Sequence, residues 1–359
     1  MTRPNYYGLI MAGGRGTRFW PRSRRKSAKQ VLRFFGDRSL IQQCVDRLGP
    51  LVPPERVWVV TNAFLRDEII RQLPEVPRAQ IIAEPTQRNT APCIGLAAQI
   101  LQGIDPDAIM GVFPADHLIA RTRPYLRLAK AAYRAAEKNH IVVLGIQPRW
   151  AETGYGYIEF PAGVQPGLLK PYPVIRFKEK PDAATAQRYL EAGNYAWNSG
   201  QFFWRADVFL EALRRYLPRT ATVLAGLPKF GSRRFATALQ ENFPRCENIS
   251  VDYAVLEKAS NVVGIAAGDI GWNDVGSWNA VFEIGRRDAS GNVVFSETLP
   301  LDSTGNLVDA RGKLVALLGV RDLVVVDTPD ALLVADRSRA QEVSSLVKQL
   351  EKTGREDLL

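Results

Sequence analysis

Residues 9–19 read LIMAGGRGTRF, the end of an apolar run followed by a glycine-rich turn. The run 6–11 is short and apolar, as in a buried strand. Glycine lets a backbone approach a phosphate group closely and present its N–H groups to it. Two arginines inside the turn, Arg15 and Arg18, also favour an anion. The stretch therefore predicts a strand that ends in a phosphate-binding turn, with a plain tight turn as the alternative.

The turn differs from two common nucleotide-binding loops. No Gly-Lys-Ser/Thr follows it, which excludes a P-loop, and Phe19 stands where the dinucleotide motif requires its third glycine. The nature of the nucleotide must therefore come from other residues.

The first half of the chain alternates short apolar runs with amphipathic stretches. The expected strands are 6–11, 57–61, 80–83, 108–113 and 141–145, and the expected helices are 40–48, 63–73, 91–101 and 124–138. This alternation predicts an α/β fold with a Rossmann-like mixed or parallel sheet, covered on both faces. Ligands of such sheets bind beyond the carboxyl ends of the strands, so we expect a site just after Met11, Ala83 and Phe113.

The second half changes character along its length. Residues 150–285 predict strands at 157–160 and 174–177 and helices at 183–192, 207–216 and 252–258. Short β-branched runs then recur at 293–295, 307–309, 314–318, 323–326 and 331–335. They predict a small β domain, either a sandwich fragment or part of a β-helix. A closing helix at 339–351 carries an apolar stripe of Val343, Leu346, Val347 and Leu350. We expect a large domain at 1–287 and a β-rich domain at 288–359 that pack together.

Composition narrows the class of protein. The chain has 359 residues, of which 46% are hydrophobic and 23% charged, as in ordinary folded proteins. No apolar run approaches the ~18 residues of a membrane helix, and the start lacks the features of a signal peptide. Cys44, Cys93 and Cys246 are too far apart for a disulfide framework or a zinc knuckle. These observations predict a cytoplasmic protein without a membrane partner.

The net charge of +10 is concentrated near the N-terminus. Residues 1–38 contain one acid, Asp37, and the following basic residues: Arg3, Arg15, Arg18, Arg22, Arg24, Arg25, Lys26, Lys29, Arg33 and Arg38. Such a segment suits nucleic acid, a small polyanion such as a nucleoside triphosphate, or a solvated surface. Charge alone leaves these alternatives open, and we expect no nucleic-acid partner.

The residues after the turn complete a longer pattern. The string GGxGTRxWPxSR followed by Lys29-Gln30 resembles the signature of sugar-1-phosphate nucleotidyltransferases, and its WP and KQ variants resemble the mannose-1-phosphate guanylyltransferase branch. Further matching stretches follow in order: EPTQRNTAP at 84–92, FPADH at 113–117, FKEKP at 177–181, WNSG at 197–200, SVDYAVLE at 250–257 and GWNDVGSW at 271–278. The resemblance spans roughly residues 8–280. Ala28 departs from it, because the family has proline before the lysine, and this segment should be looser without loss of activity.

The resemblance implies transfer of GMP from GTP to α-D-mannose 1-phosphate, giving GDP-mannose and pyrophosphate. The sugar phosphate is already ionised, so catalysis needs charge neutralisation and positioning rather than a general base. By resemblance, Arg18 and Lys29 hold the triphosphate, Asp116 and Asp274 hold Mg²⁺, and Lys180 pairs with the phosphate of the sugar. Taken singly, Asp116 could cap a helix and Asp274 could belong to an ordinary turn.

The resemblance also implies two binding regions. The expected nucleotide-binding residues are Ala12, Gly13, Gly14, Gly16, Thr17, Arg18, Lys29, Glu84, Arg88, Asn89, Thr90 and Asp116. The expected sugar-phosphate-binding residues are Gly154, Gly156, Glu179, Lys180 and Asn198. The guanine-reading group stays open among Glu84, Arg88, Asn89 and Thr90, since Arg88 could also bind a phosphate or fold the loop.

Several alternatives remain at this level. Asp252 and Glu257 lie on an expected helix and can be structural, and His117 either orients Asp116 or packs in its loop. The protein could use another sugar phosphate, such as glucose 1-phosphate, or another nucleotide, or be a non-catalytic relative. The β tail and its helix suggest a homodimer, as in the short form of the family.

Overall fold

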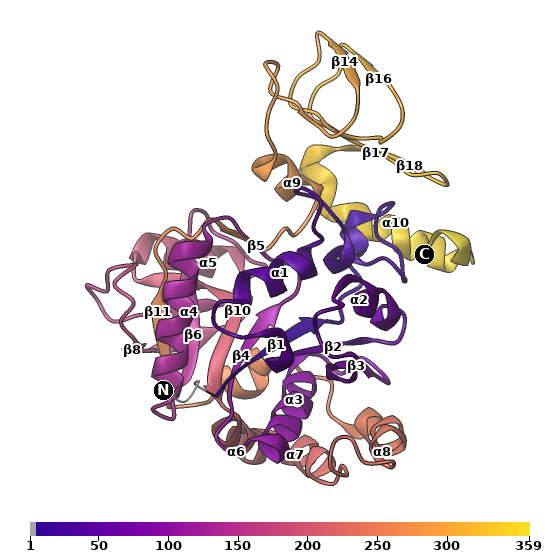
Figure 1. Ribbon diagram of the computed structural model, residues 1–359. Helices are drawn as coiled ribbons and strands as arrows, with labels where there is room; N and C mark the ends of the chain where they lie inside the picture. The colour runs from indigo at the N-terminus through magenta and orange to yellow at the C-terminus, as the bar shows by residue number, and fades with distance from the viewer. Residues whose placement is uncertain (1–4) are drawn as a thin grey trace.

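The computed structural model describes residues 5–359; residues 1–4, including Arg3 of the basic segment, lie outside this range. Within it, ten strands form one large sheet, with the order β3-β2-β1-β4-β10-β6-β11-β8 and with β7 and β9 attached through β10 (Figure 1). The strands are β1 (Tyr6–Ala12), β2 (Val57–Asn62), β3 (Ile81–Glu84), β4 (Ile109–Pro114), β6 (Ile141–Ile146), β7 (Tyr157–Glu159), β8 (Tyr172–Pro173), β9 (Arg176–Lys178), β10 (Tyr195–Arg205) and β11 (Val262–Ala266).

The sheet is mixed, as expected for the fold class. Strands β3, β2, β1 and β4 are parallel, and β11 is parallel to β6. The sequence analysis missed β10, which lies antiparallel between β4 and β6. The pairing of β10 with β6 shifts register between Asn198 and Phe202, and Gly200 has a φ of +69°. This irregularity is a bulge, a device that redirects side chains next to functional sites.

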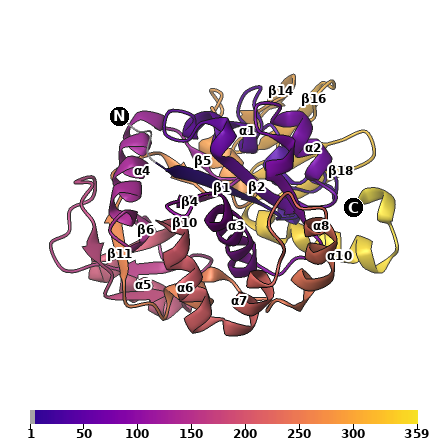
Figure 2. The same cartoon turned by 60° about the horizontal axis from the view of Figure 1, so that its bottom comes forward.

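Helices cover both faces of the sheet, as Figure 2 shows. On one face lie α1 (Leu40–Leu48), α2 (Arg66–Gln72) and α4 (Thr122–Ala136), and on the other lie α3 (Thr90–Ile104), α6 (Ala206–Tyr216), α7 (Pro218–Ala225) and α8 (Phe235–Asn242). Alternation along β1 explains the two cores. Tyr6 and Ile10 point into the first, and Tyr7 and Leu9 point into the second.

Some expected elements have different bounds. The helix expected at 63–73 begins only at Arg66, because the Asn62 side chain accepts hydrogen bonds from the backbone N–H groups of Phe64 and Leu65. The strand expected at 174–177 is divided into β8 and β9. The N–H of Val174 bonds to Val262, whereas the N–H of Ile175 bonds to Glu159, so the chain changes partner there.

Other elements were not expected or differ in kind. The helix expected at 252–258 is a single π-helical turn, Asp252–Leu256. The helix α5 (Ala183–Ala192) has the expected bounds. Short elements absent from the sequence analysis are β5 (Leu118–Ile119), β12 (Trp272–Asn273) and α9 (Trp278–Ile284).

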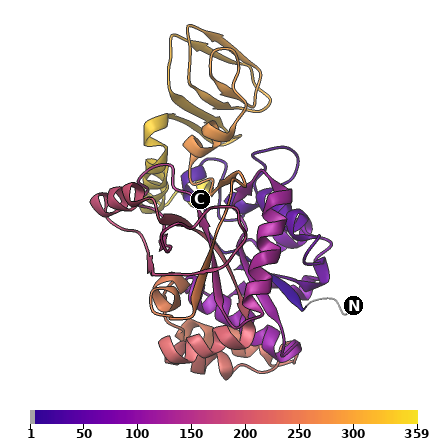
Figure 3. The same ribbon diagram turned by 90° about the vertical axis from the view of Figure 1, so that its left-hand side faces the viewer.

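The β tail is a β-helix-like coil, not a sandwich fragment. The strands β13 (Val293–Val294), β15 (Leu307–Asp309) and β17 (Leu323–Asp327) pair in parallel, as do β14 (Thr298–Leu301) and β16 (Val315–Leu318), and Figure 3 shows the coils stacked. The last strand, β18 (Leu332–Asp336), returns antiparallel to β17. Inside the coil, the buried amide of Asn306 donates to Asn292 Oδ1 at 3.0 Å, which links successive turns.

The closing helix and the domain interface depart from the simple expectation. A 3₁₀ turn, Arg337–Glu342, precedes α10 (Val343–Lys352), so the helix starts later than residue 339. Val343 and Val347 are buried, but Leu346 is 44% exposed, so the expected apolar stripe is narrower. Val343 and Val347 join a third core that also contains Trp20, Trp278 and residues of the coil. The two parts therefore pack together, while the boundary at residue 287 stays a prediction.

Much of the basic segment faces the C-terminal part of the chain. The ion pairs are Arg15–Glu351, Arg22–Asp309, Arg24–Asp330 and Arg25–Glu356. Trp20 adds a hydrogen bond from its indole nitrogen to the carbonyl oxygen of Leu358 at 3.0 Å. The four arginines thus pair with carboxylates of the same chain and not with a bound anion. None of the three alternatives for the segment describes these four residues, because they stabilise the contact between the two parts of the chain.

Asp309 should contribute most to this interface. Its side chain is 3% exposed and pairs with Arg22, whose side chain is 18% exposed, and with Arg311. We expect Asp309→Asn to lower the free energy of unfolding by about 3 kcal/mol, because it leaves a poorly hydrated guanidinium without its partner. Asp330→Asn, at a largely exposed pair, should cost less than about 1 kcal/mol. Urea unfolding measures both, and equal losses would contradict the prediction.

Two further observations concern membrane-spanning helices and the cysteine residues. Within residues 5–359, none of the helices combines the length and apolar character that crossing a bilayer requires. Cys44, Cys93 and Cys246 are buried as free thiols.

Candidate active site

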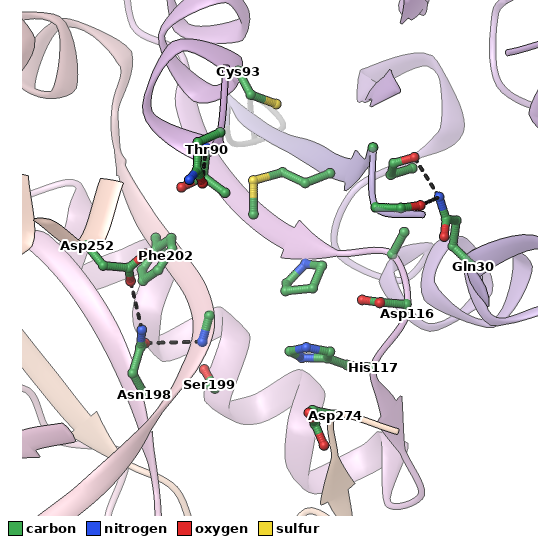
Figure 4. A pocket seen from close by; sticks show the side chains of 18 of the residues that line it. Gln30, Thr90, Cys93, Asp116, His117, Asn198, Ser199, Phe202, Asp252 and Asp274 are labelled. Atoms are coloured by element: carbon green, nitrogen blue, oxygen red, sulfur yellow. Dashed lines mark hydrogen bonds between the residues drawn. The ribbon is translucent and has the colours of Figure 1, made fainter. Parts of the chain in front are cut away.

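A cavity of about 740 Å³ opens at the carboxyl ends of the central strands. Its wall includes residues 11–14 at the end of β1, residues 84, 87, 89 and 90 at and after the end of β3, and residues 114–117 at the end of β4, where the sequence predicts a site. Figure 4 shows Asp116, His117 and Asp274 along one side and Asn198 and Asp252 across from them. The bulge of β10 supplies Asn198, Ser199 and Gly200.

Most of the expected site residues line this cavity. They are Ala12, Gly13, Gly14, Glu84, Asn89, Thr90, Asp116, Gly154, Gly156, Glu179, Asn198 and Asp274. The others, which do not line it, are Gly16, Thr17, Arg18, Lys29, Arg88 and Lys180.

Side chains hold the carbonyl groups of the glycine turn. The Gln30 amide donates to the carbonyl oxygens of Ala12 at 2.7 Å and Gly14 at 3.1 Å, and the Gln87 amide donates to that of Gly13. Gly16 has a φ of +62°, and a Cβ there would lie 2.6 Å from Lys29 Cβ. Only glycine fits this position, so Gly16 makes room for Lys29 instead of lining the cavity.

Thr17 and Ala28 lie on the same segment, outside the cavity. Thr17 starts a 3₁₀ turn and lines a small crevice with Arg15 and Trp20. Ala28 is 1% exposed and has a φ of −73°, within the range that proline would impose. The backbone at Ala28 therefore has the conformation that the family's proline would impose, although the residue is alanine.

Lys29 connects the two expected metal-binding segments. It is 7% exposed, and its Nζ lies 2.9 Å from Asp116 Oδ2 and donates to the carbonyl oxygen of Asp274 at 2.6 Å. Desolvation raises the pKa of Asp116, but the charges of Lys29 and His117 outweigh it and leave the pKa below its ordinary value. Asp116 is therefore ionised at neutral pH. It pairs with Lys29 instead of capping a helix.

Asp274 separates two spaces. It lines the main cavity and also an adjoining cavity of about 510 Å³, where Arg18 is found. Arg18 Nη1 donates to the carbonyl oxygen of Gly276 at 2.9 Å. Burial, and then the charge of Asp274, to which its hydroxyl is hydrogen-bonded, raise the pKa of Tyr155. Arg18 thus faces the site from the far side of Asp274.

The opposite wall is a cluster of polar groups. Asn198 Nδ2 donates to Asp252 Oδ1 at 3.0 Å, and Lys180 Nζ donates to Glu179 Oε1 at 2.7 Å. A Cβ on Gly156 would lie 2.5 Å from Glu179 Oε2, so a side chain there would displace the Glu179 carboxylate. Desolvation, and then the charge of Glu179, raise the pKa of Asp252. The cluster presents both donors and acceptors, as recognition of a sugar requires.

Asp252 and Glu257, which could each belong to the site or be structural, have different positions in the structure. Asp252 lines the cavity, whereas Glu257 lies behind it and accepts a hydrogen bond from the backbone N–H of Glu179 at 3.0 Å. The packing alternative describes His117 better, because its Nδ1 accepts from the indole N–H of Trp272 at 3.3 Å.

Glu84 and Arg88 behave differently although they share one segment. Glu84 is 7% exposed and lines the cavity, and within residues 5–359 its Oε1 has no hydrogen-bond partner. Burial raises the pKa of Glu84 to about 8, although a hydrogen bond with Cys93 lowers it somewhat. Arg88 Nη2 donates to the carbonyl oxygen of Pro244, so its guanidinium supports the loop and points away from the cavity.

Comparison with known proteins explains this arrangement. The family model described as Nucleotidyl transferase matches residues 7–291, and one described as MannoseP isomerase/GMP-like beta-helix domain matches residues 296–350. The chain belongs to the nucleotidyl transferase family. It is therefore an enzyme of nucleotidyl transfer, and its β tail is the expected β-helix-like domain.

Relatives of this nucleotidyl transferase match almost its whole length. The mannose-1-phosphate guanylyltransferase of Escherichia coli is 39% identical over 97% of this chain and 74% of its own length. The alginate biosynthesis protein AlgA of Pseudomonas aeruginosa is 38% identical over 97% of this chain and 73% of its own. The crystal structure of mannose-1-phosphate geranyltransferase from Thermus thermophilus is 35% identical, with a TM-score of 0.85, and covers 97% of this chain and 99% of that one.

The sequence analysis missed several residues of the cavity. They include Gln30, Gln87, Cys93, Tyr155, Asn248 and Trp272. Gln30, Gln87 and Trp272 belong to the matching stretches and could have been chosen there. Asn248 lies just outside the 250–257 stretch, so its place in the cavity is evident only from the fold of the nucleotidyl transferase.

The raised pKa of Glu84 predicts a pH dependence of stability. Between the unfolded value of about 4.3 and the folded value of about 8, the native state binds more protons than the unfolded state. The free energy of unfolding should therefore fall as pH rises through this window. Glu84→Gln has no titrating group at this position, so its stability should not show this fall. The free energy of unfolding of Glu84→Gln minus that of the parent should therefore be roughly 2–4 kcal/mol larger at pH 8.5 than at pH 5. Melting curves of both proteins at the two pH values test this, and a constant difference would contradict it.

Proposed function

We propose that this nucleotidyl transferase transfers GMP from GTP to α-D-mannose 1-phosphate, giving GDP-mannose and pyrophosphate. One observation carries the proposal: a single cavity joins the glycine turn, Asp116 and Asp274, and the Glu179–Asn198–Asp252 wall. Lys29 links the two aspartate segments from outside the cavity. This order suits a nucleotide, a reacting phosphate and a sugar. The guanylyltransferase named above supports the choice of GTP and mannose 1-phosphate.

The chemistry needs little more than positioning and charge. An oxygen of the sugar phosphate forms a bond to the α-phosphorus of GTP, and the bond from that phosphorus to pyrophosphate breaks. The nucleophile is ionised at neutral pH, so no side chain has to remove a proton. In the proposed arrangement, Lys29 neutralises charge beside the α-phosphate, and Arg18, in the adjoining cavity, holds the leaving pyrophosphate.

Asp116 and Asp274 would hold Mg²⁺ in this scheme. The ion prefers one or two carboxylates together with phosphate oxygens and water. Across residues 5–359, no cluster of three or more His, Cys, Asp or Glu side chains can hold a metal by itself, which suits an ion shared with the substrate. When bound, Mg²⁺ supplies positive charge to the phosphate oxygens.

Lys180 should act on the sugar phosphate. Its ammonium lies beside Glu179 at the cavity wall and keeps a half-exposed position from which it can reach a phosphate. We expect Lys180→Ala to lower kcat/KM for mannose 1-phosphate about 100-fold, while KM for GTP changes less than about threefold. Initial rates with each substrate varied in turn measure this. Lys178→Ala is the matched control, and a change confined to GTP would contradict the role.

Pyrophosphate release tests the function itself. Purified protein with Mg²⁺ is offered every pairing of GTP, ATP, UTP and dTTP with mannose 1-phosphate or glucose 1-phosphate. Fast release only with GTP and mannose 1-phosphate supports the proposal. Faster release with another pair would reassign the substrate, and no release with any pair would favour a non-catalytic relative.

We further propose a homodimer formed through the β-helix-like domain. The outer faces of β14, β16 and β18 expose large apolar side chains, namely Leu299, Leu301, Leu318, Leu332 and Val334. Exposed apolar clusters of this kind are typical of protein interfaces. Sedimentation of a ~40 kDa monomer at micromolar concentration would contradict the dimer, since the chain mass is 39.9 kDa.

The proposal also includes the cellular location of the protein and the absence of membrane and nucleic-acid partners. The three free thiols support a cytoplasmic location, and we expect no membrane partner. The pairing of four arginines with carboxylates of the same chain supports the absence of a nucleic-acid partner. Salt-sensitive retention on immobilised DNA or RNA would contradict this last expectation.

A further inference from the structure

The position of Asp274 depends on a short turn, residues 273–276, between β12 and α9. Strand β12 pairs with β5, and this pairing sets Asn273 opposite Leu118, next to the segment of Asp116. Figure 4 shows the Asp274 and Asp116 side chains on the same side of the cavity. An ion shared by the two carboxylates therefore requires this turn to keep Asp274 in one orientation.

Side chains from distant segments hold the backbone of the turn. Lys29 Nζ donates to the carbonyl oxygen of Asp274 at 2.6 Å. Arg18 Nη1 donates to the carbonyl oxygen of Gly276 at 2.9 Å. A Cβ on Gly276 would lie 2.9 Å from Asp274 Oδ2, so the carboxylate lies directly against the Cα of this glycine. The orientation of the carboxylate thus depends on the path of the chain from residue 274 to residue 276.

Val275, between these two residues, has an unusual backbone. Its φ is +48°, in the left-handed region that a β-branched residue rarely adopts because its side chain is strained there. The side chain is fully buried in the third core, together with Phe19 and Trp278. The Asn273 side chain accepts at Oδ1 from the backbone N–H of Val275 at 2.7 Å, which closes an Asx turn around Asp274. Strained residues persist only where their surroundings hold them, and they gather at active sites.

We propose that Asn273 and Val275 are positioning residues that hold the Asp274 carboxylate in the orientation that an ion shared with Asp116 requires. Asn273 fixes the turn by its hydrogen bond, and the buried side chain of Val275 prevents the turn from relaxing. Glycine would adopt the same φ without strain, but it would leave the turn free to move. The inference rests on the proposed function, in which Asp274 holds Mg²⁺. It gives the C-terminal part of the chain a role at the site, because residues of the coil complete the core around Val275.

Melting temperatures test whether the turn is strained. Val281 is also fully buried in the third core but lies within α9, so it is the matched control. Glycine is less stable than alanine inside a helix, so Val281→Gly should melt about 2 °C below Val281→Ala. At residue 275, alanine keeps the strained Cβ and glycine does not, so this difference should disappear or reverse. The same glycine deficit at both positions would overturn the role of Val275.

Binding of GTP with and without the metal tests whether the turn positions Asp274. Calorimetry measures the Kd of GTP in Mg²⁺ and again in EDTA, for the unaltered enzyme and for Asp274→Asn, Asn273→Ala, Asn273→Asp, Val275→Gly and Asn261→Ala. The control residue, Asn261, is exposed and precedes β11, whereas the cavity opens at the carboxyl ends of the strands. Its variant therefore makes the same change as Asn273→Ala away from the site.

Mg²⁺ should tighten GTP binding at least about 10-fold in the unaltered enzyme and in Asn261→Ala, and less than about twofold in Asp274→Asn. Asn273→Ala should keep the Kd measured in EDTA but show an Mg²⁺ effect about fivefold smaller. Its kcat should fall about 30-fold, while KM for mannose 1-phosphate changes less than about threefold. Asn273→Asp keeps an acceptor oxygen and should restore both. Val275→Gly frees the turn and should lower kcat about 10-fold, with a smaller Mg²⁺ effect.

An unchanged Mg²⁺ effect and kcat in folded Asn273→Ala would overturn the role of Asn273, as would a failure of Asn273→Asp to restore them. If Asn273→Ala does not fold, the Mg²⁺ effect and kcat of Val275→Gly decide, and parent values there overturn the proposal. A failure of the proposed function has a different signature. In that case the unaltered enzyme does not bind GTP or shows no Mg²⁺ effect, or Asp274→Asn keeps the whole effect, while the comparison of residues 275 and 281 still reveals the strain. This result would overturn the metal role of Asp274 and, with it, the positioning role of its neighbours.

Discussion

Replacing Asp274 by asparagine is expected to lower kcat about 10³-fold, equivalent to about 4 kcal/mol of transition-state stabilisation. Asp274 lines both cavities at the point where the main cavity meets the space that holds Arg18. An amide in its place keeps the shape and the hydrogen bond to Tyr155 but removes the negative charge that a magnesium ligand needs. The melting temperature should therefore change by only a few degrees while turnover is lost.

Pyrophosphate release at saturating GTP, mannose 1-phosphate and Mg²⁺ measures this effect. Asp269→Asn is the matched control, because Asp269 lies shortly before β12, is largely exposed and pairs with Arg121 outside the cavity. It should keep near-parent turnover. Turnover of Asp274→Asn within tenfold of the parent would show that Asp274 does not hold the metal.

Replacing Lys29 by glutamine is expected to lower kcat/KM for GTP about 10³-fold. The ammonium pairs with Asp116 and donates to the backbone of Asp274, so its removal affects both acidic segments at once. It also takes away the positive charge closest to the expected α-phosphate. Because Asp116 loses its ion partner, the melting temperature should fall as well.

The control for this variant is Lys26→Gln, which removes an exposed charge from the same basic segment. Kinetics at a temperature well below the melting point of each protein separate the two effects of Lys29. A lower melting temperature with unchanged kcat/KM would mean that Lys29 only stabilises the loop. A normal response to Mg²⁺ in Lys29→Gln would likewise count against its place beside the metal.

The basic segment shows where sequence reasoning reached its limit. Ten positive charges near a glycine turn suggest an anion, and charge alone does not identify which one. Arg15 and Arg18 are three residues apart, yet Arg15 pairs with Glu351 and Arg18 faces the adjoining cavity. Their difference depends on where α10 lies, and this is decided by packing between residues more than 300 positions apart.

The 84–92 stretch shows the same limit within the site. Glu84, Arg88, Asn89 and Thr90 all have suitable chemistry for guanine, and no pattern ranks them. The end of β3 buries Glu84, while the left-handed backbone of Asn89, with a φ of +64°, turns the chain into α3. Only the folded loop shows that Arg88 reaches Pro244 and that Glu84 lies in the wall of the cavity.

By itself, the sequence indicated the α/β class, the strand ends at which the cavity opens, the family and twelve of the residues that line the cavity. These features rest on local periodicity and on short motifs, which neighbouring residues express together. The tertiary structure alone decided the antiparallel insertion of β10, the parallel coil of the tail, the pairing of the basic segment and the position of Lys29 between Asp116 and Asp274. These features depend on contacts between distant segments, and the free energy of such contacts is not encoded in any local pattern.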